Sequence, residues 1–588
     1  MKTVLRPGEP VGGDHAITGT FPTLDHIIAF KEGTAEFDHG YYRFVSHPRL
    51  RQLEAELKSR FTCRHCRLTE SLETALLELI LCLHAQGTRS RIVILKEEGA
   101  ATPFKDERFL PACDREGVSV LTLAPTEKPA SNLGRSDFLL IAPGKKNDNS
   151  PSPQSAAIAS TVSAALAQGA HVIAVVTAAN GEVPGPRPEV SEAQFFVLGL
   201  RAAQGPAKAG AVLGNEDAIM DQLVQQMKRR GPMLSSRAAD CLLGSGSALS
   251  TAPEDADAAA ARVADALCRL EGGTRAFLYS SGMSAITRVL DLLRQPGKSQ
   301  IVAVGHLYSD TFQSLLLGEN LFLEVDELNS LENCVGNQTA AIFTETITNP
   351  LSDVPDLQAL SRTARAHGIP LVVDNTIASP LNCNPFEFGA DYVIHSTTKY
   401  LNGKNDHGGG VVIVRDPRAA QMLSDCQALL DDGMSPLEAA ALEKSLGSLR
   451  ERMRRFNENA VSVEGFLAGH PGVKRTFFNA NPSHRSYATA RRILKGPGSV
   501  IGFTLARDTW EGLRAFYDSP LAGIHKAPSL GSDVTLLCPY TLLTHYENTD
   551  EELAKIGLPR FLLRIAVGCE MDIAPVIASL DEALTRSG

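Results

Sequence analysis

Short apolar runs alternate with polar and Ala-rich stretches along most of the chain. In the first half they lie at 91–95, 118–123, 138–142 and 172–176, and in the second half at 277–283, 301–304, 340–344, 371–373 and 410–414. Runs of this length predict buried strands, and the stretches between them predict helices. Strands that alternate with helices form βαβ units, which assemble into a mostly parallel sheet. The pattern therefore predicts two α/β regions in one chain.

Composition changes at two places predict where the chain divides. Residues 244–253 are rich in Gly, Ser, Ala and Thr, as is typical of a flexible linker. A long amphipathic helix is predicted over 437–456, and after Ala460 the pattern changes to short strands and hairpins. We therefore predict three domains, at residues 1–245, 246–460 and 461–588.

The overall composition excludes several classes of protein. The 588 residues are 43% hydrophobic and carry a net charge of −10, which predicts a globular protein without nucleic-acid or membrane partners. No apolar run approaches the roughly 20 residues of a membrane span, and the N-terminus lacks the apolar core of a secretory signal. The 11 scattered cysteines favour reduced thiols in a cytoplasmic enzyme. Cys63 and Cys66 form a lone CxxC pair, so we predict no metal site.

The segment from Asp391 to Gly403 carries the clearest chemical signal. A β-rich run ends in the hydroxyl residues Ser396 and Thr398, and Lys399 follows. Burial at a strand end favours the neutral, nucleophilic form of a lysine amine. The two hydroxyls alternate on one side of an extended segment, so both can reach one anion. Together they predict a Schiff base with pyridoxal phosphate (PLP), and the alternative is a surface lysine after an edge strand.

Two further positions fit the same cofactor. The run from Gly368 to Asp374 predicts a central parallel strand that ends in an acid. A carboxylate there lies at the ligand-binding edge of the sheet, where it can hold a pyridine nitrogen protonated. Near Tyr279 a strand turns into a helix, and the backbone N–H groups of Gly282 and Met283 at the helix start predict a phosphate site.

Five motifs in this order resemble a known family: Tyr279-Ser-Ser-Gly-Met-Ser-Ala-Ile286, Glu345-Thr-Ile-Thr-Asn-Pro350, Val373-Asp-Asn-Thr376, His395-Ser-Thr-Thr-Lys-Tyr400 and Arg564-Ile-Ala-Val-Gly568. Over roughly residues 260–588 the chain resembles the Cys/Met metabolism family of PLP-dependent enzymes, especially its cystathionine γ-synthases with an N-terminal extension. The resemblance implies the aspartate aminotransferase-like fold (fold type I), with a large PLP domain and a small C-terminal α+β domain.

The resemblance also implies roles for further residues. Tyr308 would stack on the cofactor ring and assist proton transfer, and Asn349 would bind its phenolic oxygen. Arg564 would bind the substrate carboxylate, assisted by the segment that begins at Ser529. This segment departs from the family pattern, because the usual glutamate is absent between Ser529 and Thr535. Contacts to the distal amino group of a substrate are therefore in doubt.

The first half resembles the second and predicts a degenerate copy of the large domain. Residues 167–176 align with 366–375, and 196–203 align with 392–399. In this alignment Val175 takes the place of Asp374, and Ala203 takes the place of Lys399. Leu72-Glu73 stands where the second half has its phosphate-binding helix start, so the first half should bind no cofactor. Chance similarity between two α/β segments is the alternative.

The N-terminal region supplies a motif that the second half lacks. In the family, a Tyr-x-Arg motif reaches across a dimer interface to the neighbour's cofactor phosphate. Ala252-Pro253-Glu254 stands at the expected place in the second half, whereas Tyr41-Tyr42-Arg43 fits the motif. We therefore predict an internal pseudo-dimer in which Tyr41 and Arg43 serve the site of Lys399, within a homo-oligomer such as a homodimer. The alternative is that Arg43 is a surface charge.

The predicted reaction is γ-replacement on an activated homoserine ester by cysteine, which gives cystathionine for transsulfuration and methionine biosynthesis. The substrates are small amino acids, and the catalytic residues are Lys399, Tyr308 and Asp374. The alternatives are a cystathionine β- or γ-lyase, a homoserine sulfhydrylase, or a non-catalytic protein that binds partners through its first half.

Overall fold

The computed structural model describes residues 256–587 apart from 317–319, 327 and 431, together with residues 21 and 23–31. Between residues 32 and 255 it describes seven strands and the helical positions 58, 75, 79, 220 and 223. The chain divides into two compact units. Residues 1–47, 257–423 and 438–588 form the first unit, and residues 48–256 and 424–437 form the second.

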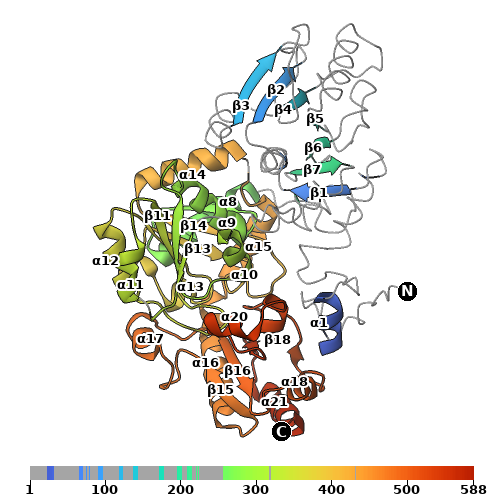
Figure 1. Ribbon diagram of the computed structural model, residues 1–588, viewed down its shortest axis with the longest axis vertical. Coiled ribbons are helices and arrows are strands. Elements are labelled where there is room, and N and C mark those ends of the chain that lie inside the picture. The colour runs from blue at the N-terminus through green and yellow to red at the C-terminus, as the bar shows by residue number, and fades with distance from the viewer. Residues whose placement is uncertain are drawn as a thin grey trace. The chain divides into compact units, whose positions relative to one another are not determined.

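The larger sheet of the first unit has seven strands in the order β10-β9-β11-β12-β13-β14-β8 (Figure 1). Strands β10, β9, β11, β12 and β13 are parallel, and β14 is antiparallel to both β13 and β8. This confirms the predicted mostly parallel sheet. Their bounds are β8 Arg275–Tyr279, β9 Gln300–Val304, β10 Leu321–Leu323, β11 Thr339–Glu345, β12 Leu371–Asp374, β13 Tyr392–Ser396 and β14 Gly410–Val414.

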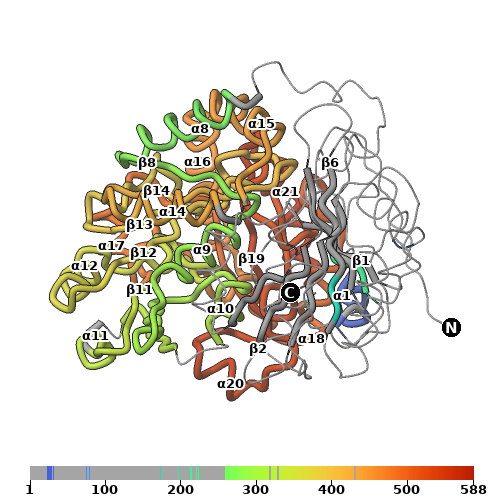
Figure 2. The backbone as a smooth tube through the Cα atoms, turned by 90° about the horizontal axis from the view of Figure 1, so that it is seen from above, coloured from blue at the N-terminus to red at the C-terminus, as the bar shows by residue number. Residues whose placement is uncertain are grey.

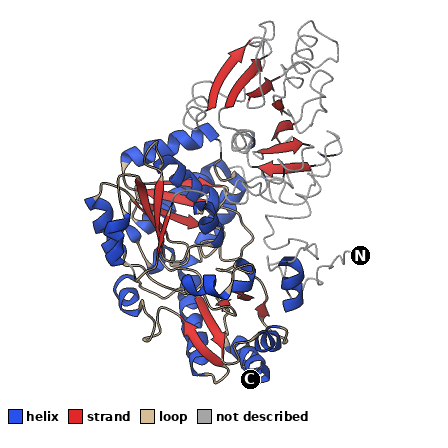
Figure 3. Cartoon of the chain, in the orientation of Figure 1, coloured by secondary structure: helices blue, strands red, loops and turns tan. Residues whose placement is uncertain are grey.

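Helices connect and cover these strands (Figure 3). Helix α9 packs against β13 and β14, and it begins where the Ser281 side chain accepts a hydrogen bond from the Ser284 backbone N–H. Helix α8 lies beside α15 (Figure 2), where Arg262 pairs with Glu443 at 2.6 Å. The helices are α8 Ala256–Glu271, α9 Gly282–Leu293, α10 Ser309–Leu315, α11 Leu328–Cys334, α12 Leu357–Ala366, α13 Ser379–Asn382, η2 Pro385–Phe388, α14 Pro417–Leu430 and α15 Pro436–Leu446.

The small domain is the predicted C-terminal α+β unit. Its five-stranded sheet has the order β15-β16-β19-β18-β17, and only β17 and β18 pair in parallel. The strands are β15 Val473–Phe477, β16 Val500–Leu505, β17 Ile524–His525, β18 Thr535–Pro539 and β19 Leu563–Ala566. The helices are α16 Leu449–Gly469, α17 Tyr487–Ile493, α18 Trp510–Tyr517, α19 Tyr540–Thr544, α20 Asp550–Lys555 and α21 Ala574–Ser587.

The single helix predicted over 437–456 is wrong. Two helices, α15 and α16, occupy this region, and the break falls at Gly447 and Ser448. Glycine has a low helix propensity, so an interruption here costs little. Helix α16 also continues past Ala460 to Gly469, because Ala460, Val463 and Leu467 face the small-domain core.

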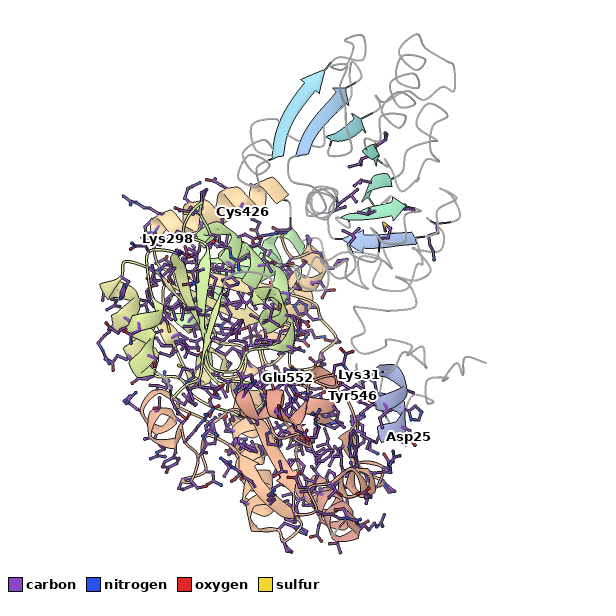
Figure 4. The ribbon with its side chains drawn as sticks, viewed as in Figure 1. Asp25, Lys31, Lys298, Cys426, Tyr546 and Glu552 are labelled. Atoms are coloured by element: carbon purple, nitrogen blue, oxygen red, sulfur yellow. The ribbon has the colours of Figure 1, made fainter. Side chains whose placement is uncertain are left out.

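The short helix α1 (Leu24–Lys31) belongs to the core of the small domain. Leu24 and Ile27 are fully buried there, together with Phe21. The Tyr517 hydroxyl donates to the Phe21 carbonyl at 2.9 Å, and the Leu24 N–H donates to Asp518 Oδ1 at 2.7 Å. Figure 4 labels Asp25 and Lys31 on α1 and Tyr546 on the neighbouring loop of the small domain. Residues from opposite ends of the chain therefore form one core.

The second unit contains a seven-stranded sheet in the order β1-β7-β6-β5-β4-β2-β3. The larger sheet of the first unit, formed by β8 to β14, has the same arrangement. In this comparison β1 takes the place of β8, and β3 takes the place of β10. The parallel and antiparallel pairings also match one for one. The strands are β1 His65–Thr69, β2 Ser90–Lys96, β3 Val118–Leu123, β4 Asp137–Ala142, β5 His171–Thr177, β6 Phe195–Arg201 and β7 Lys208–Gly214.

The strand registers allow the two sheets to be aligned without reference to side-chain identity. The row Gly199–Gly210–Thr69 in the second unit corresponds to Ser396–Gly410–Tyr279 in the first. Counted on in the sequence from Thr69 and Tyr279, Leu72-Glu73 aligns with Gly282-Met283, but Leu72 and Glu73 lie outside the described residues, so their predicted correspondence stays a prediction. The pairing of Val175 with Val197 likewise corresponds to that of Asp374 with Ile394. Counted on in the same way from Ser396 and Gly199, Lys399 aligns with Ala202, one residue before the predicted Ala203, and both alanines lie outside the described residues.

Among the helices that the structure describes, none is both long enough and apolar enough to cross a membrane.

Candidate active site

Three strands of the larger sheet end together and define the edge where the candidate residues gather. Strand β11 ends at Glu345 and β12 at Asp374, and these two residues are direct neighbours in the parallel register. Strand β13 ends at Ser396, and Lys399 lies in the turn that follows. Lys399 and Asp374 therefore lie at the carboxyl edge of the sheet, where open α/β sheets bind ligands.

The Lys399 side chain meets the loop that the sequence assigned to substrate binding. Lys399 Nζ donates to Ser529 Oγ at 3.0 Å, and Ser529 is buried. Gly531 has a φ of +69°, and a Cβ at this position would lie 2.7 Å from the Tyr400 backbone nitrogen. Because only glycine permits this conformation and approach, the loop lies directly against the backbone of the lysine.

Asp374 is a buried carboxylate with one oxygen already occupied. Its Oδ1 accepts hydrogen bonds from the Thr376 N–H at 2.9 Å and from the Thr376 hydroxyl at 2.5 Å. Its Oδ2 accepts no hydrogen bond from any residue that the structure describes. Burial raises the pKa of Asp374, whereas Thr376 and the His395 ring act in the opposite direction. The carboxylate can therefore offer Oδ2 to a proton donor on a ligand.

The start of α9 lies next to Ser396 and presents groups that can bind an anion. A Cβ on Gly282 would lie 2.8 Å from the Ser396 Cβ, so glycine is required for the helix start to approach this strand end. The Ser396 hydroxyl therefore lies close to the N-terminal turn of the helix, and Thr398 follows two residues later and is buried. Thr398 Oγ1 accepts from the Gly409 N–H at 3.3 Å. With Met283, these groups have the composition of a phosphate site.

Arg564 on β19 connects the small domain to the same edge. Its Nη1 donates to Asn349 Oδ1 at 3.3 Å, and its Nη2 donates to the Ser529 carbonyl at 2.8 Å and to the Pro528 carbonyl. The guanidinium carbon lies 5.5 Å from the centre of the Tyr540 ring. The predicted substrate residues Arg564, Asn349 and Ser529 are thus brought together beside Lys399.

Tyr308 precedes α10 and is hydrogen-bonded to two carboxyl groups. Its backbone N–H donates to Glu345 Oε1 at 2.5 Å, and its hydroxyl donates to Asp310 Oδ2 at 2.8 Å. Neither Glu345 nor Asp310 is among the predicted site residues. Glu345 ends a buried strand as Asp374 does, and this signal was available in the sequence. Asp310 and Thr376 gave no such signal, because their contacts depend on side-chain direction.

A buried polar cluster lies behind the edge. His395 Nε2 lies 2.6 Å from Glu271 Oε1, and Asn375 Nδ2 donates to the same oxygen at 2.7 Å. All three residues are buried. The contacts join the end of α8 to β12 and β13, more than 100 residues away along the chain. They therefore hold the strand ends in place.

Some of the predicted positions cannot be compared with the structure. Tyr41, Arg43 and Cys63 are not among the described residues. Within the described part of the chain, no three His, Cys, Asp or Glu side chains are grouped as metal ligands would be.

The residues at this edge fit PLP. The cofactor needs an anion site for its phosphate, an acid at its ring nitrogen and an amine at its aldehyde. The start of α9, Asp374 Oδ2 and Lys399 provide these three groups. Because Gly282 has no side chain, the helix start can approach Ser396, which supplies a hydroxyl for the phosphate.

Comparisons with known proteins agree with this fit. The family model described as "Cys/Met metabolism PLP-dependent enzyme" matches residues 257–585. An L-methionine gamma-lyase from Pseudomonas deceptionensis is 35% identical over 54% of this chain and 81% of its own length. A cystathionine gamma-synthase from Mycobacterium leprae is 30% identical over 54% of this chain and 82% of its own. The crystal structure of a cystathionine gamma synthase from Xanthomonas oryzae pv. oryzae matches with a TM-score of 0.53 and 33% identity, covering 56% of this chain and 86% of that one.

Proposed function

We propose that this chain, which belongs to the Cys/Met metabolism family of PLP-dependent enzymes, catalyses γ-replacement on an activated homoserine ester. Cysteine is the sulfur donor and cystathionine is the product. One observation carries the proposal: Ser529 accepts hydrogen bonds from both Lys399 Nζ and Arg564 Nη2. An amino acid whose α-carboxylate binds Arg564 therefore presents its Cα and Cβ to the lysine amine.

Separate groups of the site bind the phosphate, the ring nitrogen and the phenolic oxygen of the cofactor. When bound, PLP withdraws electrons from the substrate's α-carbon. The backbone N–H groups of Gly282 and Met283 hold its phosphate with the hydroxyls of Ser396 and Thr398. Asp374 Oδ2 keeps the proton on the ring nitrogen, since Thr376 occupies Oδ1. Asn349 binds the phenolic oxygen.

Lys399 and Tyr308 carry the protons. The Lys399 amine removes the proton from the substrate Cα and then acts at Cβ, as a positioned general base. Ser529 Oγ orients the amine toward the carbon atoms of a substrate bound at Arg564. The Tyr308 hydroxyl, oriented by Asp310, donates a proton to the departing ester group. Cysteine sulfur then adds at Cγ, and Lys399 returns protons to Cβ and Cα.

Elimination is the second candidate function. When no nucleophile adds at Cγ, the same proton transfers are followed by hydrolysis, in which water enters and an α-keto acid and ammonia are released. The methionine gamma-lyase relative at 35% identity favours this outcome. The segment from Ser529 to Thr535 lacks the family glutamate. The missing glutamate would affect how the enzyme holds a substrate with a distal amino group. Both synthases and lyases have such substrates, so the missing glutamate favours neither function.

A product assay separates the two functions. The holoenzyme is incubated with cysteine and, in turn, with succinyl-, acetyl- and phosphohomoserine. We expect cystathionine from one of these esters. Formation of 2-oxobutanoate and ammonia in the presence of cysteine would identify a lyase instead. A protein that is neither coloured by PLP nor labelled with borohydride would be a non-catalytic member of the family.

We also propose that residues 65–214 are a copy of the large-domain sheet without a cofactor site. The matching strand order and register support this. The internal pseudo-dimer and the homo-oligomer remain proposals from the sequence. A cytoplasmic location is a proposal too, supported by the six free cysteines among the described residues.

A further inference from the structure

Two carboxyl groups lie side by side at the edge that carries the cofactor site. Glu345 and Asp374 are paired residues on the neighbouring parallel strands β11 and β12. Glu345 is 5% exposed and Asp374 is 8% exposed. Like charges at such neighbouring buried positions disfavour double ionisation, so one of the two groups should keep a proton.

The surroundings of the two groups differ. Asp374 accepts two hydrogen bonds from Thr376, and the His395 ring lies near enough to favour its charge. Glu345 accepts one hydrogen bond, from the Tyr308 backbone N–H. Within the described residues no Lys, Arg or His forms an ion pair with Glu345. The titratable groups that face it are Asp374 and Tyr540. The proton of the pair therefore belongs on Glu345.

We propose that Glu345 works as a neutral carboxylic acid that positions Tyr308, and that Asp374 carries the negative charge of the pair. The inference rests on the proposed roles of Tyr308 and Asp374 at the cofactor ring, but not on which family reaction follows.

The electrostatics agree with this assignment. Burial, and after it the neighbouring Asp374, raises the pKa of Glu345 well above its ordinary value. The pKa of Asp374 is raised as well, but Thr376 and His395 oppose the shift. A neutral Glu345 still accepts the hydrogen bond from Tyr308 through its carbonyl oxygen. It also leaves a single anion, Asp374, to face the protonated ring nitrogen.

Two substitutions test the proposal in the holoenzyme. Glu345→Gln keeps the shape, the neutrality and the acceptor oxygen, so we expect kcat and the cofactor Kd to stay within about threefold of wild type. Glu345→Ala removes the acceptor for the Tyr308 N–H, and we expect the cofactor Kd to weaken by about tenfold, the effect of losing one hydrogen bond. Both are read from the absorbance of bound PLP and from steady-state rates.

A third readout is independent of activity. A buried acid with a raised pKa stabilises the fold below its unfolded pKa, near 4.5, and loses this contribution as the pH rises toward its folded pKa. Glutamine does not titrate. The Tm of Glu345→Gln minus that of wild type should therefore increase as the pH rises above about 4.5. The exposed control Glu451→Gln should show no such increase.

Each of these measurements has an outcome that would contradict the proposal. A loss of kcat of about 100-fold or more in Glu345→Gln would mean that the carboxylate is ionised or transfers a proton, and would overturn the proposal. A Tm difference that stays flat or falls with pH would overturn it too. Wild-type cofactor affinity in a folded Glu345→Ala would refute the positioning role. If γ-replacement itself is absent, the cofactor and Tm readouts still apply, so the two failures can be told apart.

Discussion

At the scale of single residues, the site is organised by short hydrogen bonds between the sheet edge and the small domain. Ser529 is the clearest example, because its hydroxyl faces Lys399 and its carbonyl faces Arg564. The lysine and the arginine are therefore held at a fixed separation before any ligand binds. Preorganisation of this kind reduces the entropy lost when a substrate is oriented.

Lys399→Ala should abolish activity and leave the fold intact. The substitution removes the amine that binds the cofactor and moves the substrate's protons, but it removes no core packing. The measurement is product formation, with far-UV circular dichroism as a check on folding. Lys404→Ala is the matched control, because Lys404 is exposed and lies five residues further along the same segment. Substantial turnover by Lys399→Ala would contradict the assignment.

Asp374→Asn should still bind PLP but lose most of its rate. A neutral amide cannot stabilise the positive charge on the ring nitrogen, whereas the hydrogen bonds from Thr376 can still reach its remaining oxygen. Steady-state kinetics and a cofactor titration of the same preparation separate the two effects. An unchanged kcat would show that the aspartate has only a structural role.

At the scale of elements, local pattern predicted strands better than helix ends. The apolar runs that end at Asp374 and Ser396 were correctly recognised, since a buried parallel strand is a continuous apolar stretch. The break between α15 and α16 was missed because both sides continue an amphipathic pattern. The contacts of Thr376 and Asp310 could not be predicted either, since they depend on turns formed by the folded chain.

Helix α1 gives a test of how the small domain is stabilised. Leu24 is fully buried, so Leu24→Ala should reduce the free energy of unfolding of the small domain by about 2–5 kcal/mol. Asp25→Ala lies on the same helix and removes only an exposed ion pair with Arg514, so it should cost at most about 1 kcal/mol. Urea denaturation followed by circular dichroism compares the two. Equal effects would mean that α1 contributes no core packing.

At the scale of the whole molecule, the chain contains two sheets of one topology, and the candidate catalytic groups of the described residues lie at the edge of one of them. By the strand registers, Asp374 corresponds to Val175, and counting on along the sequence aligns Lys399 with Ala202. Continuing the same register, Glu345 corresponds to Ala142. At the aligned positions small apolar residues stand in place of the three ionisable groups, which supports the proposal of a copy without a cofactor site.

This difference predicts one PLP per chain. The cofactor released from the purified holoenzyme by alkali is measured by its absorbance and compared with the protein concentration. A ratio near one is expected, because Ala202 and Val175 stand where the first unit has the lysine for the aldehyde and the carboxylate for the ring nitrogen. A ratio near two would contradict the proposed loss of the second site.

The last prediction concerns Arg43, which the sequence assigns to the cofactor phosphate. If Tyr41 and Arg43 supply the Tyr-x-Arg motif for the site of Lys399, Arg43→Ala should weaken cofactor binding by about 2–5 kcal/mol, the usual cost of removing one partner from a buried charge pair. Arg49→Ala, in the same segment but outside the motif, is the control and should bind PLP as wild type does.

A point substitution is a better test here than a truncated chain. Removal of residues 1–245 would also remove Phe21, Leu24 and Ile27 from the core of the small domain. Such a chain would lose cofactor through unfolding whether or not Arg43 contacts the phosphate. Arg43→Ala leaves that core in place, so the cofactor Kd from equilibrium dialysis reports on the charge alone. Unchanged affinity in Arg43→Ala would end the proposal that the N-terminal motif completes the site.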